Sequence, residues 1–182
     1  MAEFYPRLTA DGINGNRLWY ADNPFYQNGY GLPNCTCYAW GRFWEIGGGG
    51  SDIRPTLSLS DAELWYDYID GYERSQTPAL GSIICYANGP YSGYGHVAVV
   101  EEIHDDGSIT TSNSGWTRDP ELMPSYYFYL SRNLTPPNYL PVSGYVFQGF
   151  ILNPHGGGKP TGRGKKIWLY KRKLWRIEKN DY

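Results

Sequence analysis

Small and aromatic residues follow one another after Pro33 without a polar face, as expected for a helix that is buried on most sides. Asn34 is a suitable N-cap because its short side chain can accept hydrogen bonds from the first unpaired N–H groups of a helix. A run of glycines beginning at Gly47 then breaks the pattern. These features predict a helix over Cys35–Ile46.

A second helix is predicted over residues 61–69. Ser60 and Glu63 have the spacing of a capping box, in which each side chain accepts a hydrogen bond from the other residue's backbone N–H. The apolar residues that follow recur at helical spacing and form a short amphipathic face. The preceding residues 1–34 are rich in Asn, Gly, Pro and Tyr and lack this spacing, which predicts an irregular lead-in.

Short runs of β-branched and aromatic residues dominate the second half of the chain, separated by clusters of Gly, Pro, Asn and Asp. Each run predicts a strand. Because helices come first and strands follow without regular alternation, we expect an α+β protein whose N-terminal helices pack on an antiparallel sheet. The predicted strands span residues 81–87, 96–103, 108–112, 126–130 and 145–152.

Charge divides the chain into two unequal parts. From His155 to Tyr182 nine Lys and Arg stand against two Asp and Glu, so this part carries +7 and the remainder −9. Glycines predict a flexible linker over residues 155–164, and aromatic residues interleave with basic ones in a tail over residues 165–182. The tail is expected either to bind anionic polymers or lipid headgroups, or to pack on the acidic domain over residues 1–154.

The chain of 182 residues is long enough for one domain with its own core. No apolar run has the length of a bilayer span, and the first residues lack the basic and apolar regions of a secretion signal. The sequence therefore predicts a protein made in the cytoplasm. Its three cysteines do not suggest a disulfide framework, and at least one thiol must stay free.

A thiol and an imidazole stand at the starts of two predicted elements. Cys35 opens the first helix, where unpaired N–H groups and the helix dipole favour a thiolate and are expected to lower the pKa of the thiol. His96 opens a predicted strand. A cysteine with a nearby histidine is typical of thiol hydrolases.

The hairpin formed by the second and third predicted strands supplies a third candidate. If Ile103 pairs with Ser108, then His96 lies opposite Gly115. Asn113 becomes the diagonal neighbour of His96 on the same face of the sheet, and the Cβ atoms of such neighbours lie roughly 7 to 8 Å apart. The Asn113 side chain is then within reach of the imidazole, whereas a slip of one residue would present a serine instead.

Two blocks of the sequence resemble the CHAP domain, a family of cysteine- and histidine-dependent amidohydrolases and peptidases that cut bacterial peptidoglycan and recur in phage lysins. Asn-Cys-Thr-Cys-Tyr, from Asn34, resembles the family's Gln/Asn-Cys-Thr-Trp-Tyr block, and Gly-His-Val-Ala, from Gly95, resembles its Gly-His-Val-Ala block. The resemblance covers about residues 13–154. Cys37 stands where the family commonly has Trp, and Asn113 stands where it frequently has Glu.

The resemblance implies a papain-like fold and covalent catalysis. Cys35 would be the nucleophile, His96 the general base and then acid, and Asn113 the residue that orients the imidazole. Backbone N–H groups at the helix start, together with the Asn34 side chain, would stabilise the oxyanion. The implied reaction cleaves an amide bond of peptidoglycan, as an N-acetylmuramoyl-L-alanine amidase or as an endopeptidase.

Loop aromatics near the proposed site are candidates for lining the substrate groove, namely Tyr91, Tyr94 and Trp116. The expected partner is bacterial peptidoglycan, and the tail adds anionic wall polymers as a second candidate. Neither a cofactor nor a nucleic acid is expected. A wall hydrolase without a secretion signal fits a phage lysin that leaves the host cytoplasm through a membrane pore, or a component of the virion.

Other interpretations stay open at this point. Cys35, Cys37, Cys85 and His96 are possible zinc ligands, although residues two apart on a helix point roughly 200° apart and do not easily bind one ion. A calcium site needs a cluster of acidic side chains, and the sequence offers few of them for such a site. A catalytically silent domain of the same fold would only bind wall material, and an intracellular amidase would use the same residues on a small thiol peptide or polyamine conjugate.

Overall fold

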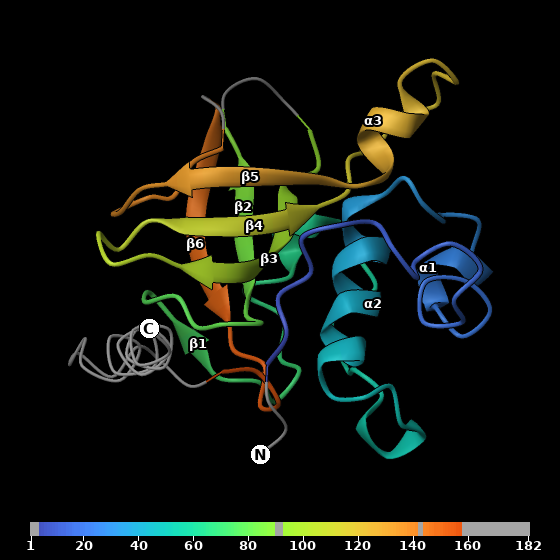
Figure 1. Cartoon of the computed structure of the whole chain (residues 1–182), viewed down its shortest axis with the longest axis horizontal. Helices are drawn as coiled ribbons and strands as arrows, with labels where there is room; N and C mark the ends of the chain where they lie inside the picture. Colours follow the sequence, from blue (N-terminus) through green and yellow to red (C-terminus); the bar gives the residue numbers. More distant parts are fainter. Residues whose placement is uncertain (1–3, 90–92, 142–143, 158–182) are drawn as a thin grey trace, which may run out of the picture.

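The fold is built on one antiparallel sheet, and the helices lie to one side of it (Figure 1). The computed structural model describes residues 4–89, 93–141 and 144–157. Within these residues the order across the six-stranded sheet is β1-β6-β2-β3-β4-β5. The strands are β1 (Arg74–Ser75), β2 (Ile83–Asn88), β3 (His96–Ile103), β4 (Ile109–Asn113), β5 (Tyr129–Leu134) and β6 (Tyr145–Ile151). The helices are α1 (Pro24–Gln27), α2 (Cys35–Ile46) and α3 (Met123–Tyr127), with 3-10 turns η1 (Ser51–Ile53) and η2 (Ala62–Leu64).

Helix α2 packs against β3 and is buried on most of its surface, as its sequence predicts. Its aromatic residues share a core with Trp19, whose ring approaches the helix backbone at Gly41. A Cβ atom at Gly41 would lie 2.6 Å from that ring, so only glycine permits this approach. Trp40, Trp44 and Trp65 are all buried in this core. The expected α+β class, with N-terminal helices packed on an antiparallel sheet, is confirmed.

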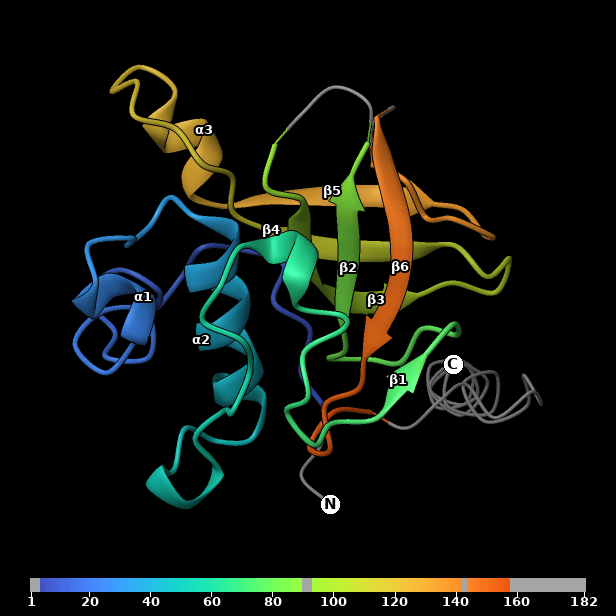
Figure 2. The same cartoon turned by 180° about the vertical axis from the view of Figure 1, so that it is seen from behind.

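Strand β3 is apolar on both faces because two separate cores lie on either side of it. Val97 and Val99 belong to the core shared with α2, whereas Ala98 and Val100 belong to a second core on the opposite face. Figure 2 shows β2 and β6 running crosswise to β4 and β5, so the sheet curls around this second core. His96, at the start of β3, is therefore carried by a strand that is held on both faces.

The hairpin of β3 and β4 changes register at a bulge. Ile103 pairs with Ile109 and not with Ser108, so the predicted register is wrong by one residue at the turn. A bulge at Glu101 then adds one residue to β3, and beyond the bulge the pairing follows the predicted register. Because the bulge compensates for the turn, Asn113 still reaches the side of the sheet that carries the His96 ring.

The second helix, predicted over residues 61–69, is wrong in its length, because only a short 3-10 turn forms there. The 3-10 turn η2 ends at Leu64 and irregular turns follow it. Asp61, not Ser60, takes the N-cap position, and its side chain makes no capping hydrogen bond. The indole N–H of the buried Trp65 donates to the Ser60 carbonyl at 3.1 Å, which folds the segment back on itself instead of extending a helix.

The strand predicted over residues 126–130 is divided between two elements. Helix α3 ends at Tyr127 and β5 begins at Tyr129. A proline in the first turn of α3 favours a helix start there, which the β-favouring aromatics obscure. The other four predicted strands are present, each with ends within two residues of the prediction. Helix α1 and strand β1 are too short to leave a periodic signal.

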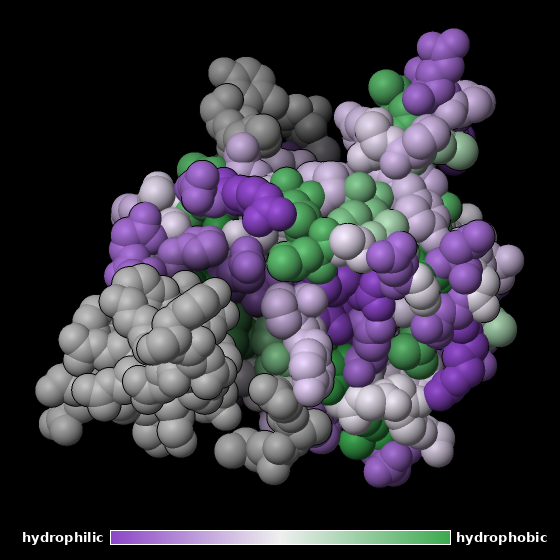
Figure 3. Space-filling model, viewed as in Figure 1, coloured by the Kyte–Doolittle hydropathy of each residue, from purple (hydrophilic) through white to green (hydrophobic). Residues whose placement is uncertain are grey.

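The described surface mixes hydrophilic and hydrophobic residues, with a small hydrophobic group near the centre of the face in Figure 3. Among the described residues, no helix combines the length and the apolar character needed to cross a bilayer. The start of the predicted linker packs on the domain, since a Cβ atom at Gly156 would lie 2.2 Å from the Leu80 carbonyl oxygen. The rest of the linker and the tail over residues 165–182 lie outside the described residues, so the proposed domain division stays a prediction.

Candidate active site

Cys35 stands at the first position of α2, as predicted. Asn34 has extended backbone angles, and its Oδ1 atom accepts hydrogen bonds from the Cys37 backbone N–H at 3.0 Å and from Thr36 Oγ1 at 2.6 Å. This cap fixes the first turn of the helix and directs it to begin at the cysteine. The Cys35 side chain is half-buried and lines a cavity of about 1040 Å³.

Asn34 is held from a second direction by the loop that follows β4. Its backbone N–H donates to Ser114 Oγ at 3.0 Å, and the Ser114 hydroxyl donates to the Tyr126 carbonyl at 3.0 Å. Since the Asn34 Oδ1 atom is occupied by the helix cap, its amide nitrogen is the group left to donate, and it has no protein partner among the described residues. Because Asn34 lines the cavity, its amide nitrogen is available to donate to a bound group.

His96 lies in the same cavity, and its ring contacts Asn113. His96 Nε2 and Asn113 Oδ1 are 3.0 Å apart, while Asn113 Nδ2 donates to the Thr111 carbonyl at 3.0 Å. The amide is thus oriented with its oxygen toward the ring, which assigns the proton of the neutral imidazole to Nε2. Nδ1 is then the basic nitrogen.

Backbone conformation brings His96 to this position. Gly95 has φ of +72°, and a Cβ atom there would lie 2.4 Å from the Tyr86 carbonyl oxygen and 2.6 Å from the Glu63 backbone nitrogen. Only glycine fits between these two segments. The His96 ring is also stacked against two tyrosines that contact each other, with centroids 6.3 Å from Tyr86 and 5.8 Å from Tyr145.

Burial controls the protonation of both groups. It raises the pKa of the Cys35 thiol, although hydrogen bonds from the backbone N–H groups of Val97, Thr36 and Cys35 itself act in the opposite direction. Burial lowers the pKa of His96, against the opposing effect of its hydrogen bond to Asn113. The expectation that the helix start gives Cys35 a lowered pKa is therefore wrong. Both shifts favour the uncharged form, a neutral thiol and a neutral imidazole.

Most of the predicted groove residues are in place. Tyr94 and Trp116 line the cavity and are exposed, whereas Tyr91 lies outside the described residues. The cavity is also lined by residues that the sequence did not single out, because no local pattern shows that these loops and element ends approach the site: Tyr30, Asp61, Arg118, Tyr126, Tyr129 and Tyr145.

The alternative zinc site is wrong. The sulfur of Cys37 is buried 3.6 Å from the Trp19 carbonyl oxygen, and Cys85 is buried within β2. In the described part of the chain, no three His, Cys, Asp or Glu side chains are grouped so that they could hold a metal ion. Cys37 and Cys85 belong to the core, and Cys35 is the thiol that faces the cavity.

A model of the CHAP domain matches residues 25–115, which is half of the chain and includes Cys35, His96 and Asn113. The chain belongs to the CHAP domain family. The family match agrees with the resemblance of the Asn34 and Gly95 blocks.

Curated relatives of this CHAP domain are named as an autolysin and an amidase. The probable autolysin SsaALP of Staphylococcus aureus is 39% identical over 111 residues, which are 60% of this chain and 37% of that protein. The N-acetylmuramoyl-L-alanine amidase sle1 of Staphylococcus epidermidis is 35% identical over 104 residues, 56% of this chain and 30% of that protein. The chain thus spans about a third of the length of these curated relatives.

A solved structure is also similar. The crystal structure of an N-acetylmuramoyl-L-alanine amidase from Staphylococcus aureus is 22% identical, with a TM-score of 0.40, and the match covers 64% of this chain and 31% of that chain.

Proposed function

We propose that this CHAP domain hydrolyses an amide bond of bacterial peptidoglycan through an acyl-enzyme on Cys35. The observation that carries the proposal is the 3.0 Å contact of His96 Nε2 with Asn113 Oδ1 in a site whose cavity also receives the Cys35 thiol. The substrate class is supported by the family and by the names of the relatives, an autolysin and an amidase.

The proposed reaction begins with the neutral pair. His96 Nδ1 accepts the thiol proton of Cys35 as the sulfur attacks the amide carbonyl, so charge develops on the imidazolium and on the carbonyl oxygen together. The Cys35 backbone N–H and the Asn34 side-chain amide, at the start of α2 beside the cavity, would donate to the developing oxyanion. A thiol that ionises only as it attacks needs its base close and correctly oriented.

The second half returns the proton. The imidazolium protonates the leaving amine as the C–N bond breaks, which leaves a thioester on Cys35 and a neutral His96. Water then attacks the thioester while His96 takes its proton, and the sulfur leaves and recovers that proton. Asn113 holds the ring through both steps, because its oxygen accepts from Nε2 and its amide nitrogen is anchored to Thr111.

The test compares two cysteines of the same helix. Cys35→Ala is expected to keep the fold by circular dichroism and to lose clearing of a suspension of susceptible cell walls. Cys37→Ala removes a buried sulfur and is expected to retain clearing, because Cys37 faces the core. Undiminished clearing by Cys35→Ala would refute the acyl-enzyme.

Mass analysis of fragments released from purified walls then separates the two reactions. New muramoyl ends identify an amidase, and new peptide amines identify an endopeptidase. The rival function, a catalytically silent wall-binding domain, predicts that the wild-type protein binds the same walls and releases no fragment.

We also infer a wall-anchoring role for the basic tail over residues 165–182, from its charge of opposite sign to the rest of the chain. Deletion of the tail should weaken sedimentation with cell walls at low salt, and unchanged sedimentation would contradict the anchor. The phage origin and the release of the protein through a membrane pore stay predictions of the sequence.

A further inference from the structure

Two side chains of opposite charge line the cavity around Cys35 and His96. They are Asp61, just before η2, and Arg118, in the loop after β4. Both are exposed, and neither takes part in an ion pair with another residue of the described ranges 4–89, 93–141 and 144–157. The catalytic cavity therefore presents one free carboxylate and one free guanidinium to its substrate.

Asp61 occupies a helix N-cap position, where an Asp side chain normally accepts a hydrogen bond from a backbone N–H. It is the N-cap residue of η2, yet its carboxylate accepts no capping hydrogen bond. The backbone around it is nevertheless fixed, because the Glu63 N–H donates to the Tyr94 carbonyl at 3.0 Å and so ties this wall of the cavity to the start of β3. The carboxylate is near enough to the site to contribute to the raised pKa of the Cys35 thiol.

Arg118 is held in a different wall. Its guanidinium carbon lies 5.3 Å from the centroid of the Trp116 ring, a cation–π contact that orients the group without neutralising it. The neighbouring Asp119 carboxylate accepts from the Glu121 backbone N–H at 2.9 Å, so it is engaged within the loop. Gly115, at the base of the loop, donates to the Tyr126 carbonyl at 2.8 Å and joins this wall to the segment before β5.

We propose that the cavity selects a zwitterionic wall peptide, whose free amino group is bound by Asp61 and whose free carboxylate is bound by the guanidinium of Arg118. This inference rests on the proposed function, since it assigns the substrate of the same site. The two charges come from different segments that line the cavity with Cys35, the start of η2 and the loop between β4 and α3, so a peptide that contacts both is fixed in direction as its amide passes Cys35. A cavity of about 1040 Å³ has room for several peptide residues.

The experiment measures binding, so that it does not depend on turnover. The Cys35→Ala protein is titrated calorimetrically with four synthetic stem tetrapeptides of sequence Ala-Glu-Lys-Ala, blocked at both ends. One carries both side-chain charges, one has the Lys amine acetylated, one has the Glu carboxylate amidated, and one has both changes. Each lost charge is expected to weaken binding by about fivefold, the size of an exposed charge pair.

Variants then assign each charge to its partner. In the Cys35→Ala protein, the further substitution Asp61→Asn should abolish the loss of affinity caused by acetylation of the Lys amine and keep the loss caused by amidation of the Glu carboxylate. The further substitution Arg118→Gln should do the reverse. Asp105→Asn and Arg132→Gln make the same chemical changes at exposed positions outside the cavity and should leave all four affinities unchanged.

Equal affinities for the four peptides would overturn the inference, and so would absence of measurable binding of the doubly charged peptide at millimolar concentration. A loss of affinity in Asp61→Asn that is the same for all four peptides would also overturn it. These outcomes are distinct from failure of the proposed function, which is shown by wild-type protein that releases no fragment from purified walls.

Discussion

Arg42 and Glu101 form a buried, two-pronged ion pair that joins the helix of Cys35 to the strand of His96. Arg42 Nε donates to Glu101 Oε1 and Arg42 Nη2 to Glu101 Oε2, both at 2.9 Å. Glu101 Oε1 also accepts from the Ser112 hydroxyl at 2.7 Å, next to Asn113 in β4. One carboxylate, on the bulged residue of β3, thus connects the three elements that carry the candidate catalytic residues.

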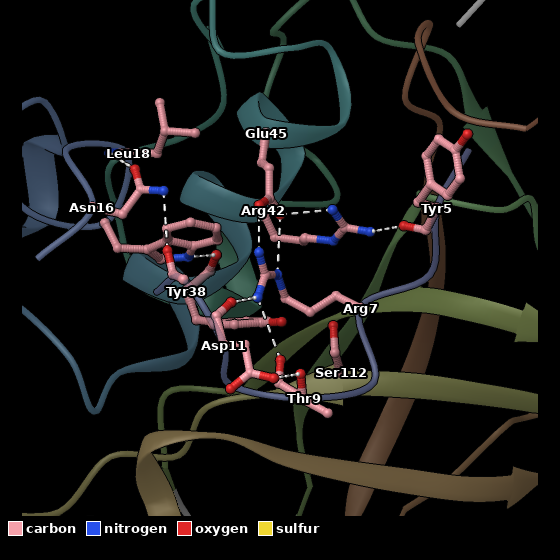
Figure 4. Close-up of polar contacts among 12 residues, drawn as sticks. Tyr5, Arg7, Thr9, Asp11, Asn16, Leu18, Tyr38, Arg42, Glu45 and Ser112 are labelled. Atoms are coloured by element: carbon pink, nitrogen blue, oxygen red, sulfur yellow. Dashed lines mark hydrogen bonds and ion pairs between the residues drawn. The ribbon is translucent and has the colours of Figure 1, made fainter. Parts of the chain in front are cut away.

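The N-terminal segment completes this network. Arg7 donates from its backbone N–H to Glu101 Oε2 at 2.8 Å, and Figure 4 shows its guanidinium and that of Arg42 converging on Glu45. Arg42 also donates to the Tyr5 carbonyl at 2.7 Å. Burial lowers the pKa of Arg42, but the hydrogen bonds and charges of its partners outweigh that effect and raise it. The buried charges are therefore fully partnered.

Glu101→Gln should unfold far more easily than the wild type. The change leaves the buried Arg42 without its main counter-charge, and loss of one partner of a buried pair costs about 3 to 5 kcal/mol of unfolding free energy. Denaturant unfolding measures the loss. Glu102→Gln is the matched control, because Glu102 is partly exposed and its ion pair with Arg132 is longer, at 3.6 Å. A stability loss no larger than that of the control would contradict the role of Glu101.

Activity should decline at low pH with a midpoint below the ordinary histidine value. In the proposed reaction His96 must be neutral to accept the thiol proton, so kcat/KM is expected to rise as the pH increases through the pKa of the free enzyme. Burial lowers that pKa, which places the midpoint below about 6.5. Initial rates of wall clearing across pH measure it. A midpoint above that value would mean that the protonated ring is stabilised in the folded protein.

Asn113→Asp should move the same midpoint upward. A carboxylate in contact with His96 Nε2 favours the imidazolium, so the pKa of the ring rises and more alkaline conditions are needed to release the base. Asn138→Asp adds the same charge at an exposed position and should leave the midpoint in place. An unshifted profile in Asn113→Asp would show that this side chain does not govern the ring. The midpoint is independent of how much of the variant is folded.

The sequence predicted those parts of the site that local rules determine. The bounds of α2 follow from the Asn34 cap and the Gly47 break, and β3 from its apolar run. The contact of Asn113 with His96 was predicted from a register that was wrong at the turn and was restored by the bulge. No local residue pattern predicts such a bulge, because the bulge depends on the position of the buried groups that bind the Glu101 carboxylate.

Long-range packing accounts for what the sequence did not predict. Residues 61–69 have a helical pattern, but burial of Trp65 folds them into turns. Asp61 and Arg118 lie in loops whose approach to the cavity depends on backbone contacts with Tyr94 and Tyr126. The raised pKa of Cys35 likewise comes from burial by distant segments, which outweighs the local effect of the helix start.

Alkylation of Cys35 tests that last point directly. A raised thiol pKa means that the thiolate forms at higher pH than in an ordinary cysteine, so the rate of reaction with iodoacetamide should rise with a midpoint above about 8.5. Cys37 and Cys85 supply the internal control. Both are buried, and burial raises the pKa of Cys37 to about 12 and raises that of Cys85, so Cys35→Ala should remain unlabelled while folded. Fast labelling of Cys35 that is already independent of pH near neutrality would instead indicate a thiolate–imidazolium pair, and His96 would then begin the reaction as an acid.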